Sequence, residues 1–141
     1  MLYRESIFIT GFPGFIAGRL VARLARSETQ FFLLVQPQFV EQAIEDIEDI
    51  AEETGVPLES FVIVGGDITR PDLRIDPEDL ETILFETTDV FHLAAVYDLA
   101  VPRDLAFNVN LEGTRNVNAF VRSVKNLRRY NYISTCYVAG K

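Results

Sequence analysis

Short runs of apolar residues recur along the chain, and they alternate with longer segments in which apolar residues return every three or four positions. The short runs are rich in β-branched and aromatic residues and predict five strands, at residues 6–10, 31–35, 61–64, 90–94 and 128–134. The longer segments predict four helices, at residues 15–26, 38–54, 78–85 and 103–126. Strands that are apolar along their length, each followed by a helix, are typical of a parallel sheet covered on both faces. The pattern therefore predicts one α/β domain over residues 1–141 with a doubly wound parallel sheet.

The helix expected over residues 38–54 has the clearest periodicity of the chain. Its apolar residues are expected on one face, opposite the acidic ones, and they are Val40, Ala43, Ile44, Ile47, Ile50 and Ala51. Gly55 follows the last of them and supplies a helix stop. We therefore expect this helix to lie on the sheet with its acidic face in water.

A glycine-containing segment, Thr10-Gly-Phe-Pro-Gly-Phe-Ile-Ala17, lies between the first predicted strand and the first predicted helix. Gly11 permits a sharp turn, and Gly14 has no Cβ to keep a pyrophosphate away from the backbone. The free amides at the start of the helix, around Phe15 and Ile16, can bind phosphate, and Pro13 is tolerated at a helix start. The spacing is G-x-x-G-x-x-A and departs from G-x-G-x-x-G, so a tight β-α turn without a nucleotide is the alternative.

The residue at the end of the second predicted strand bears on the choice of dinucleotide. An acidic residue there would bind the 2′-hydroxyl of NAD, and an arginine would accept the 2′-phosphate of NADP. The sequence has Gln36 at this point, and Arg19 in the first helix can lie near it. The absence of an acid favours NADP(H) over NAD(H), while a solvated strand end is the alternative for Gln36.

Composition and charge exclude several classes of protein. The chain has one cysteine and one histidine, which leaves no disulfide framework and few ligands for a metal site. Residues 41–89 hold 16 acidic and two basic side chains within a total net charge of −8, which disfavours general nucleic-acid binding. The apolar runs are too short to cross a bilayer, and the N-terminus lacks the features of a secretory signal. We therefore expect a cytoplasmic protein without a metal, a membrane span or a nucleic-acid partner.

Five motifs occur in the order and approximate spacing typical of one enzyme family. Besides the glycine segment, they are Gly66-Asp67, His92-Leu-Ala-Ala95, Asn110-Leu-Glu-Gly-Thr114 and Ser134-Thr-Cys-Tyr-Val-Ala-Gly140. With them the chain resembles the extended short-chain dehydrogenase/reductases, which include the NAD-dependent epimerase/dehydratases. The resemblance is closer to the male-sterility and thioester-reductase branch, which includes the fatty acyl-CoA reductases. It implies a Rossmann-type sheet of strand order 3-2-1-4-5 that ends before a sixth strand.

The resemblance implies cofactor contacts along the chain. The glycine segment, with Phe12 among its residues, would hold the pyrophosphate, and Asp67 would accept a hydrogen bond from the adenine amino group beside the Ile68 backbone. Leu93, Ala94 and Ala95 would pass beside the cofactor. The alternatives without a cofactor are a turn role for Asp67 and ordinary core packing for residues 93–95.

The resemblance also implies two catalytic positions. Thr135 matches the active-site Ser/Thr that hydrogen-bonds a substrate carbonyl, whereas its neighbour Ser134 points to the other face of the strand. Asn110 matches the asparagine at a helix kink that supports a proton relay, with a polar residue at a helix start as the alternative. His92 is expected to pack at a strand end, and Cys136 is expected to be a passive neighbour.

The acid–base pair of the family, Tyr-x-x-x-Lys on a helix, is not matched in place. Tyr137 and Lys141 have this spacing but lie too close after Thr135, where no helix is expected. The sequence thus predicts the N-terminal, cofactor-binding part of an oxidoreductase that transfers a hydride to or from a carbonyl or acyl-thioester carbon, a part inactive alone. A non-catalytic dinucleotide-sensing or scaffold module and a sugar-nucleotide epimerase or dehydratase are the alternatives. An apolar edge at the fifth strand would favour self-association.

Overall fold

The computed structural model describes residues 3–95 and 100–133, and it contains a five-stranded sheet with the strand order β3-β2-β1-β4-β5. Every neighbouring pair of strands is parallel. The strands are β1 (Glu5–Thr10), β2 (Thr29–Val35), β3 (Phe61–Gly65), β4 (Asp89–His92) and β5 (Arg129–Tyr132). The predicted parallel sheet and its order 3-2-1-4-5 are confirmed.

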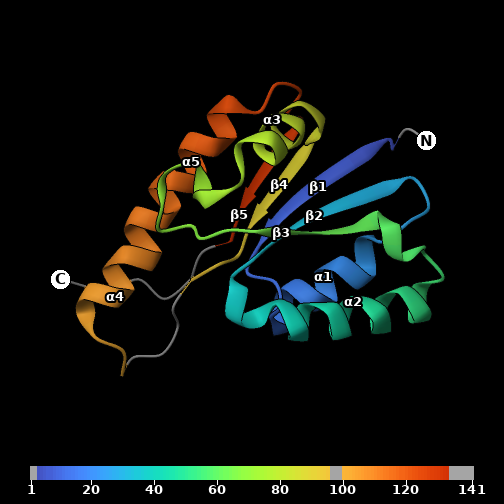
Figure 1. Cartoon of the computed structure of the whole chain (residues 1–141), viewed down its shortest axis with the longest axis horizontal. Helices are drawn as coiled ribbons and strands as arrows, with labels where there is room; N and C mark the ends of the chain where they lie inside the picture. Colours follow the sequence, from blue (N-terminus) through green and yellow to red (C-terminus); the bar gives the residue numbers. More distant parts are fainter. Residues whose placement is uncertain (1–2, 96–99, 134–141) are drawn as a thin grey trace.

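Helices cover both faces of this sheet, as Figure 1 shows. One face carries α1 (Phe15–Leu24) and α2 (Val40–Thr54), and the other carries α3 (Pro77–Glu86) and α5 (Gly113–Ser123). A short helix, α4 (Arg103–Phe107), precedes α5. The fold is therefore doubly wound, of the Rossmann type.

The two hydrophobic cores follow from the alternation of side chains along the strands. In β1, Ile7 and Ile9 belong to the core beneath α1 and α2, whereas Phe8 faces the other way. The Phe8 ring lies 4.4 Å from the ring of Phe120 on α5. All seven residues of β2 are buried, as expected for a central strand covered on both sides.

Several predicted elements differ in detail from the observed ones: the helix predicted at 15–26 ends at Leu24, and the strand predicted at 90–94 covers Asp89–His92. The helix predicted at residues 103–126 consists of α4, a π-helical turn over Asn108–Glu112 and α5, which ends at Ser123. Of the strand predicted at 128–134, the residues Arg129–Tyr132 form β5. Residues 37–39 form a 3₁₀ turn ahead of α2. Ile44 is 44% exposed, because Ala43, Ile47 and Ile50 form the buried stripe of α2 and Ile44 lies at its margin.

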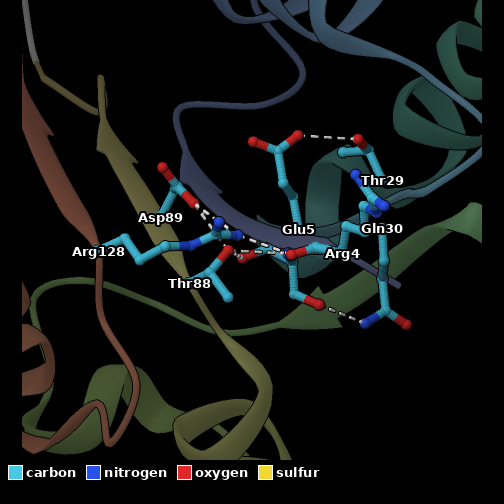
Figure 2. Close-up of polar contacts among 8 residues, drawn as sticks. Arg4, Glu5, Thr29, Gln30, Thr88, Asp89 and Arg128 are labelled. Atoms are coloured by element: carbon cyan, nitrogen blue, oxygen red, sulfur yellow. Dashed lines mark hydrogen bonds and ion pairs between the residues drawn. The ribbon is translucent and has the colours of Figure 1, made fainter. Parts of the chain in front are cut away.

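Polar side chains connect the strands at their amino ends, as Figure 2 shows. Thr29 on β2 donates to Glu5 Oε1 on β1 at 3.1 Å. Arg128 Nη2 donates to the backbone oxygen of Arg4 at 2.7 Å and lies 4.0 Å from Asp89 Oδ1. These contacts occupy the amino end of the sheet. Parallel α/β sheets bind their ligands at the carboxyl end, so an open site is expected there.

Candidate functional site

A cavity of about 720 Å³ opens at the carboxyl end of the sheet. The segments that follow β1, β2, β3 and β4 form its walls together with α4. Every residue that the sequence assigned to cofactor contact lines it: Gly11, Phe12, Pro13, Gly14, Phe15, Ile16, Gln36, Asp67, Ile68, Leu93, Ala94 and Ala95. The structure thus brings three separate motifs and Gln36 to one site, while their contact with a cofactor stays a prediction.

Seven further residues line the cavity without having been assigned to it: Thr10, Ala17, Leu34, Phe39, Gly66, Leu105 and Val109. Thr10, Ala17 and Gly66 stand inside or beside the motifs, so position along the chain was the available signal. Leu105 and Val109 come from α4 and the π-helical turn. Their place on the cavity depends on how α4 crosses the sheet end, and no local pattern indicates it.

The glycine turn between β1 and α1 is closed so tightly that side chains cannot enter it. Gly11 has φ +95°, and a Cβ there would lie 3.0 Å from the backbone nitrogen of Ala94. A Cβ on Gly14 would lie 2.5 Å from the backbone oxygen of Gly11. The first turn of α1 contains no acidic residue, and the side chain of Phe15 is 78% exposed at the cavity. The positive end of the α1 dipole therefore faces the cavity next to backbone that a ligand can approach.

The loop after β3 places Asp67 on the cavity and also uses it as a turn residue. Asp67 Oδ1 accepts hydrogen bonds from the backbone nitrogen of Thr69 at 2.9 Å and from its hydroxyl at 2.7 Å. The backbone nitrogen of Asp67 donates to the Leu73 oxygen at 2.8 Å. Asn116 on α5 donates from Nδ2 to the Ile68 oxygen at 2.8 Å. The turn role that was the alternative for Asp67 is therefore present, and the same contacts fix the carboxylate at the cavity wall.

Gln36 leaves the end of β2 with part of its hydrogen-bonding capacity used. Its Oε1 accepts a hydrogen bond from Gln38 Nε2 at 2.9 Å. Arg19, which the sequence allowed near this point, is not among the residues that line the cavity, and its guanidinium carbon lies 5.2 Å from the centre of the Phe15 ring. Gln36, the residue directly after β2, thus contributes a polar side chain to the cavity.

His92 ends β4 directly below the cavity wall and is fully buried, in agreement with the strand-end packing expected for it. Its Nδ1 lies 2.6 Å from Thr10 Oγ1, and its Nε2 lies 3.0 Å from Thr114 Oγ1. Burial lowers the pKa of His92 to about 4, because the charged form loses its hydration. The ring is therefore neutral at pH 7. Within residues 3–95 and 100–133 no group of three or more His, Cys, Asp or Glu side chains is arranged to hold a metal ion.

Residues 9–141 match the model of a family of NAD-binding domains described as male sterility protein. The chain belongs to the male sterility protein family. The resemblance to the fatty acyl-CoA reductase branch of the extended short-chain dehydrogenase/reductases is thereby confirmed. Membership indicates a nicotinamide dinucleotide as the cofactor of this domain.

Relatives of this male sterility domain are reductases by name. The chain is 26% identical to fatty acyl-CoA reductase 1 of Mus musculus, over 94% of the chain and 28% of the relative. It is 27% identical to the chloroplastic fatty acyl-CoA reductase 2 of Arabidopsis thaliana, over 99% of the chain and 26% of the relative. The terminal R domain of the myxalamid PKS-NRPS pathway has the same fold, with a TM-score of 0.76 and 22% identity over 94% of this chain and 34% of that one. The chain thus spans between about a quarter and a third of the length of these proteins.

The two predicted catalytic positions of this male sterility domain have different outcomes. Asn110 is exposed on the π-helical turn between α4 and α5, which is the helix irregularity expected there, and it does not line the cavity. Such turns are frequent at functional sites. Thr135, together with Ser134, Cys136, Tyr137 and Lys141, lies outside the described residues. Both catalytic roles stay predictions.

Proposed function

We propose that this chain binds NADP(H) in the cavity at the carboxyl end of its sheet and forms the cofactor-holding part of an acyl-thioester reductase. The observation that carries the proposal is the glycine turn. At Gly14 a Cβ would collide with the backbone of Gly11, 2.5 Å away, and the turn opens on the N-terminus of α1. A cradle without side chains at a helix N-terminus suits a pyrophosphate.

The remaining walls suit the other parts of a dinucleotide. Gln36 would lie at the adenosine ribose, and the loop of Asp67 and Ile68 would hold the adenine. The end of β4, from Leu93 to Ala95, would lie beside the nicotinamide half, where small side chains permit a close approach of the backbone. All of these residues line the one cavity, which supports a single ligand that extends across the carboxyl ends of β2, β1 and β4.

The chain would hold and shield the cofactor, which supplies a hydride when bound. Apolar side chains of Phe15, Ile16, Leu105 and Val109 line the cavity and would exclude water from it. Thr135 would hydrogen-bond the substrate carbonyl, and Asn110 would support a proton relay. We do not assign the acid–base role to Tyr137 and Lys141. We therefore propose that residues 1–141 bind the cofactor without turning over a substrate.

The preference for NADP(H) over NAD(H) rests on the end of β2. A 2′-hydroxyl is bound best by a carboxylate. Among residues 3–95 and 100–133, the only acidic side chain that lines the cavity is Asp67, which is already engaged by Thr69. Gln36 Oε1 accepts a hydrogen bond from Gln38, and the Gln36 amide group has two N–H donors. Donors without a nearby acid suit a 2′-phosphate. The substrate class, an acyl thioester, is carried over from the names of the fatty acyl-CoA reductase relatives.

Titration of the protein with NADPH and with NADH tests this function. NADPH is expected to bind and to raise the thermal midpoint, because a ligand at about 100 times its Kd stabilises the folded state by roughly 2.7 kcal/mol. NADH is expected to bind several-fold more weakly. Isothermal calorimetry up to millimolar nucleotide measures both affinities. A folded sample that gives neither heat nor stabilisation with either nucleotide would contradict cofactor binding, and equal affinities would contradict the preference alone.

Self-association through the edge of the sheet is a separate expectation. Among the strands that the structure describes, β5 is the last on its side, and Tyr132 and Ile133 at its end are 51% and 43% exposed. Exposed apolar residues at an unpaired strand favour pairing between copies. Sedimentation velocity is expected to show a mean mass that rises with protein concentration, and a monomer at every concentration would contradict this.

The helices of the structure bear on a membrane location. Among the helices that the structure describes, none combines the length and the apolar character needed to cross a bilayer. We propose a cytoplasmic protein, and microscopy of the fluorescently tagged protein in its own cell tests it, with an organellar signal as the contrary result.

A further inference from the structure

A chain of hydrogen-bonded polar groups joins three elements below the cavity and is not used by the function proposed above. It runs from Thr10 at the end of β1, through His92 at the end of β4, to Thr114 on α5. Thr10 and His92 are direct partners in the register of β1 and β4. Thr10 and His92 are fully buried and Thr114 is half-buried, so the hydrogens of Thr10 and His92 must find acceptors inside the protein.

The contacts of the Thr10 hydroxyl decide where its proton lies. Its Oγ1 accepts hydrogen bonds from the backbone nitrogens of Leu93 and Ala94, each at 3.0 Å. A hydroxyl oxygen has two acceptor lone pairs and one hydrogen, so the hydrogen is left for His92 Nδ1 at 2.6 Å. Nδ1 must then carry a lone pair. The ring hydrogen lies on Nε2 and is donated to Thr114 Oγ1 at 3.0 Å.

We propose that His92, held as the neutral Nε2–H tautomer, is a positioning residue that sets the cavity wall formed by Leu93 and Ala94. It acts through the orientation of the Thr10 hydroxyl. The functional part of this inference rests on the proposed NADP(H) binding, whereas the tautomer does not depend on it.

The wall in question is in direct contact with the glycine turn. A Cβ on Gly11 would lie 3.0 Å from both the Leu93 carbonyl carbon and the Ala94 nitrogen, so these two backbone segments already touch. If the Thr10 side chain rotates away, the Ala94 nitrogen loses its 3.0 Å bond, while the Leu93 nitrogen retains the longer bond of 3.3 Å to the Thr10 backbone oxygen. The end of β4 must then move to restore the lost hydrogen bonds. That movement would displace Gly11 and with it the pyrophosphate cradle. Thr114 extends the same chain to α5, two residues after the π-helical turn that carries Asn110.

Nitrogen-15 NMR of the single histidine tests the tautomer directly. The protein at pH 7.5 is expected to show a protonated Nε2 and an unprotonated Nδ1, as two clearly separated nitrogen shifts. Because the sequence contains one histidine, the assignment needs no second variant. A proton on Nδ1, or the averaged shifts of exchanging tautomers, would overturn the inference whether or not the protein binds a nucleotide.

Two substitutions of His92 separate its contacts. In His92→Asn the side-chain oxygen takes roughly the place of Nδ1 and can accept from Thr10, but it does not reach Thr114. In His92→Gln the amide nitrogen takes roughly the place of Nε2 and can donate to Thr114, while Thr10 loses its acceptor. The affinity for NADPH is expected to fall by less than about threefold in the asparagine variant and by about tenfold in the glutamine variant, the loss that corresponds to one hydrogen bond.

The threonine gives the matching pair of variants. Thr10→Ser keeps the hydroxyl and is expected to recover most of the affinity that Thr10→Val loses. Affinities are measured by calorimetry at a temperature where circular dichroism shows each variant folded. Equal affinities of the asparagine and glutamine variants, with only their stabilities lowered, would overturn the positioning role. If the unsubstituted protein binds no NADPH, the proposed function fails, and the NMR measurement still decides the tautomer.

Discussion

Replacing Gly14 with alanine is expected to remove most of the NADPH binding of this protein. The new Cβ would lie 2.5 Å from the backbone oxygen of Gly11, and neither atom can move by a side-chain rotation. The turn must open instead, which pulls the first amides of α1 away from the site where a pyrophosphate would bind. We expect Kd to rise about 100-fold, which corresponds to roughly 2.7 kcal/mol of binding free energy. Isothermal calorimetry measures the change.

Gly18→Ala is the matched control for this substitution. Gly18 lies inside α1, one turn after Gly14, and a Cβ there would meet nothing within 4 Å. Alanine is expected to stabilise the helix by about 0.5–1 kcal/mol, because glycine loses more backbone entropy on folding. Gly18 does not line the cavity, so the affinity for NADPH should stay as in the unsubstituted protein. A Gly14→Ala protein that binds NADPH as well as the Gly18→Ala protein would refute the cradle.

Acidification is expected to destabilise the fold through His92 alone by about 3 kcal/mol. Burial lowers the pKa of His92 from 6.5 to about 4, so between these two values the unfolded chain binds a proton that the folded chain does not. The free energy of unfolding therefore has its full His92 contribution above about pH 6.5 and loses it as the pH falls toward 4. The groups that face the ring are Thr10 from β1, Thr114 from α5 and the Tyr132 ring of β5, stacked at 5.4 Å.

Urea unfolding at several values between pH 7.5 and 4 measures this loss. The many carboxylates of the chain also titrate in this range, so the comparison is made with His92→Asn, which keeps them and lacks the imidazole. The unsubstituted protein should lose about 3 kcal/mol more than the variant over this range. Parallel curves for the two proteins would show that His92 does not carry the effect.

Much of the site could be predicted from local sequence, because its motifs are built from backbone geometry. The glycine turn is an example: Gly11 and Gly14 stand between an apolar strand and a helix, and the observed turn needs glycine at both positions. The strand-end position of Gln36 and the loop position of Asp67 follow from the same placement. The cavity residues of α4 and of the π-helical turn could not be predicted in this way, because Leu105 and Val109 look like any apolar residues of an amphipathic helix.

The helices and strands likewise include features that local sequence predicts and features that it does not. The all-apolar run within β2 predicted a strand covered on both faces, and the whole of β2 is buried between the two helical layers. The apolar spacing predicted one continuous helix where α4, the π-helical turn and α5 follow one another, because a π-helical turn leaves that spacing nearly unchanged. Ile44 fitted the periodic stripe of α2, yet it lies at the margin of the buried stripe of Ala43, Ile47 and Ile50 and is 44% exposed.

By itself the sequence determined the parallel sheet, its winding and the turn that can hold a phosphate, because apolar periodicity and glycine placement act over neighbouring residues. Only the tertiary structure decided what surrounds the single histidine. His92 follows Thr10 by 82 residues and precedes Thr114 by 22, and these side chains meet only because the register of β1 and β4 pairs Thr10 with His92 beneath α5. A slip of one residue in that register would turn the ring to the opposite face of the sheet. Long-range register, which local patterns do not encode, therefore fixes the tautomer that we infer and the cavity wall above it.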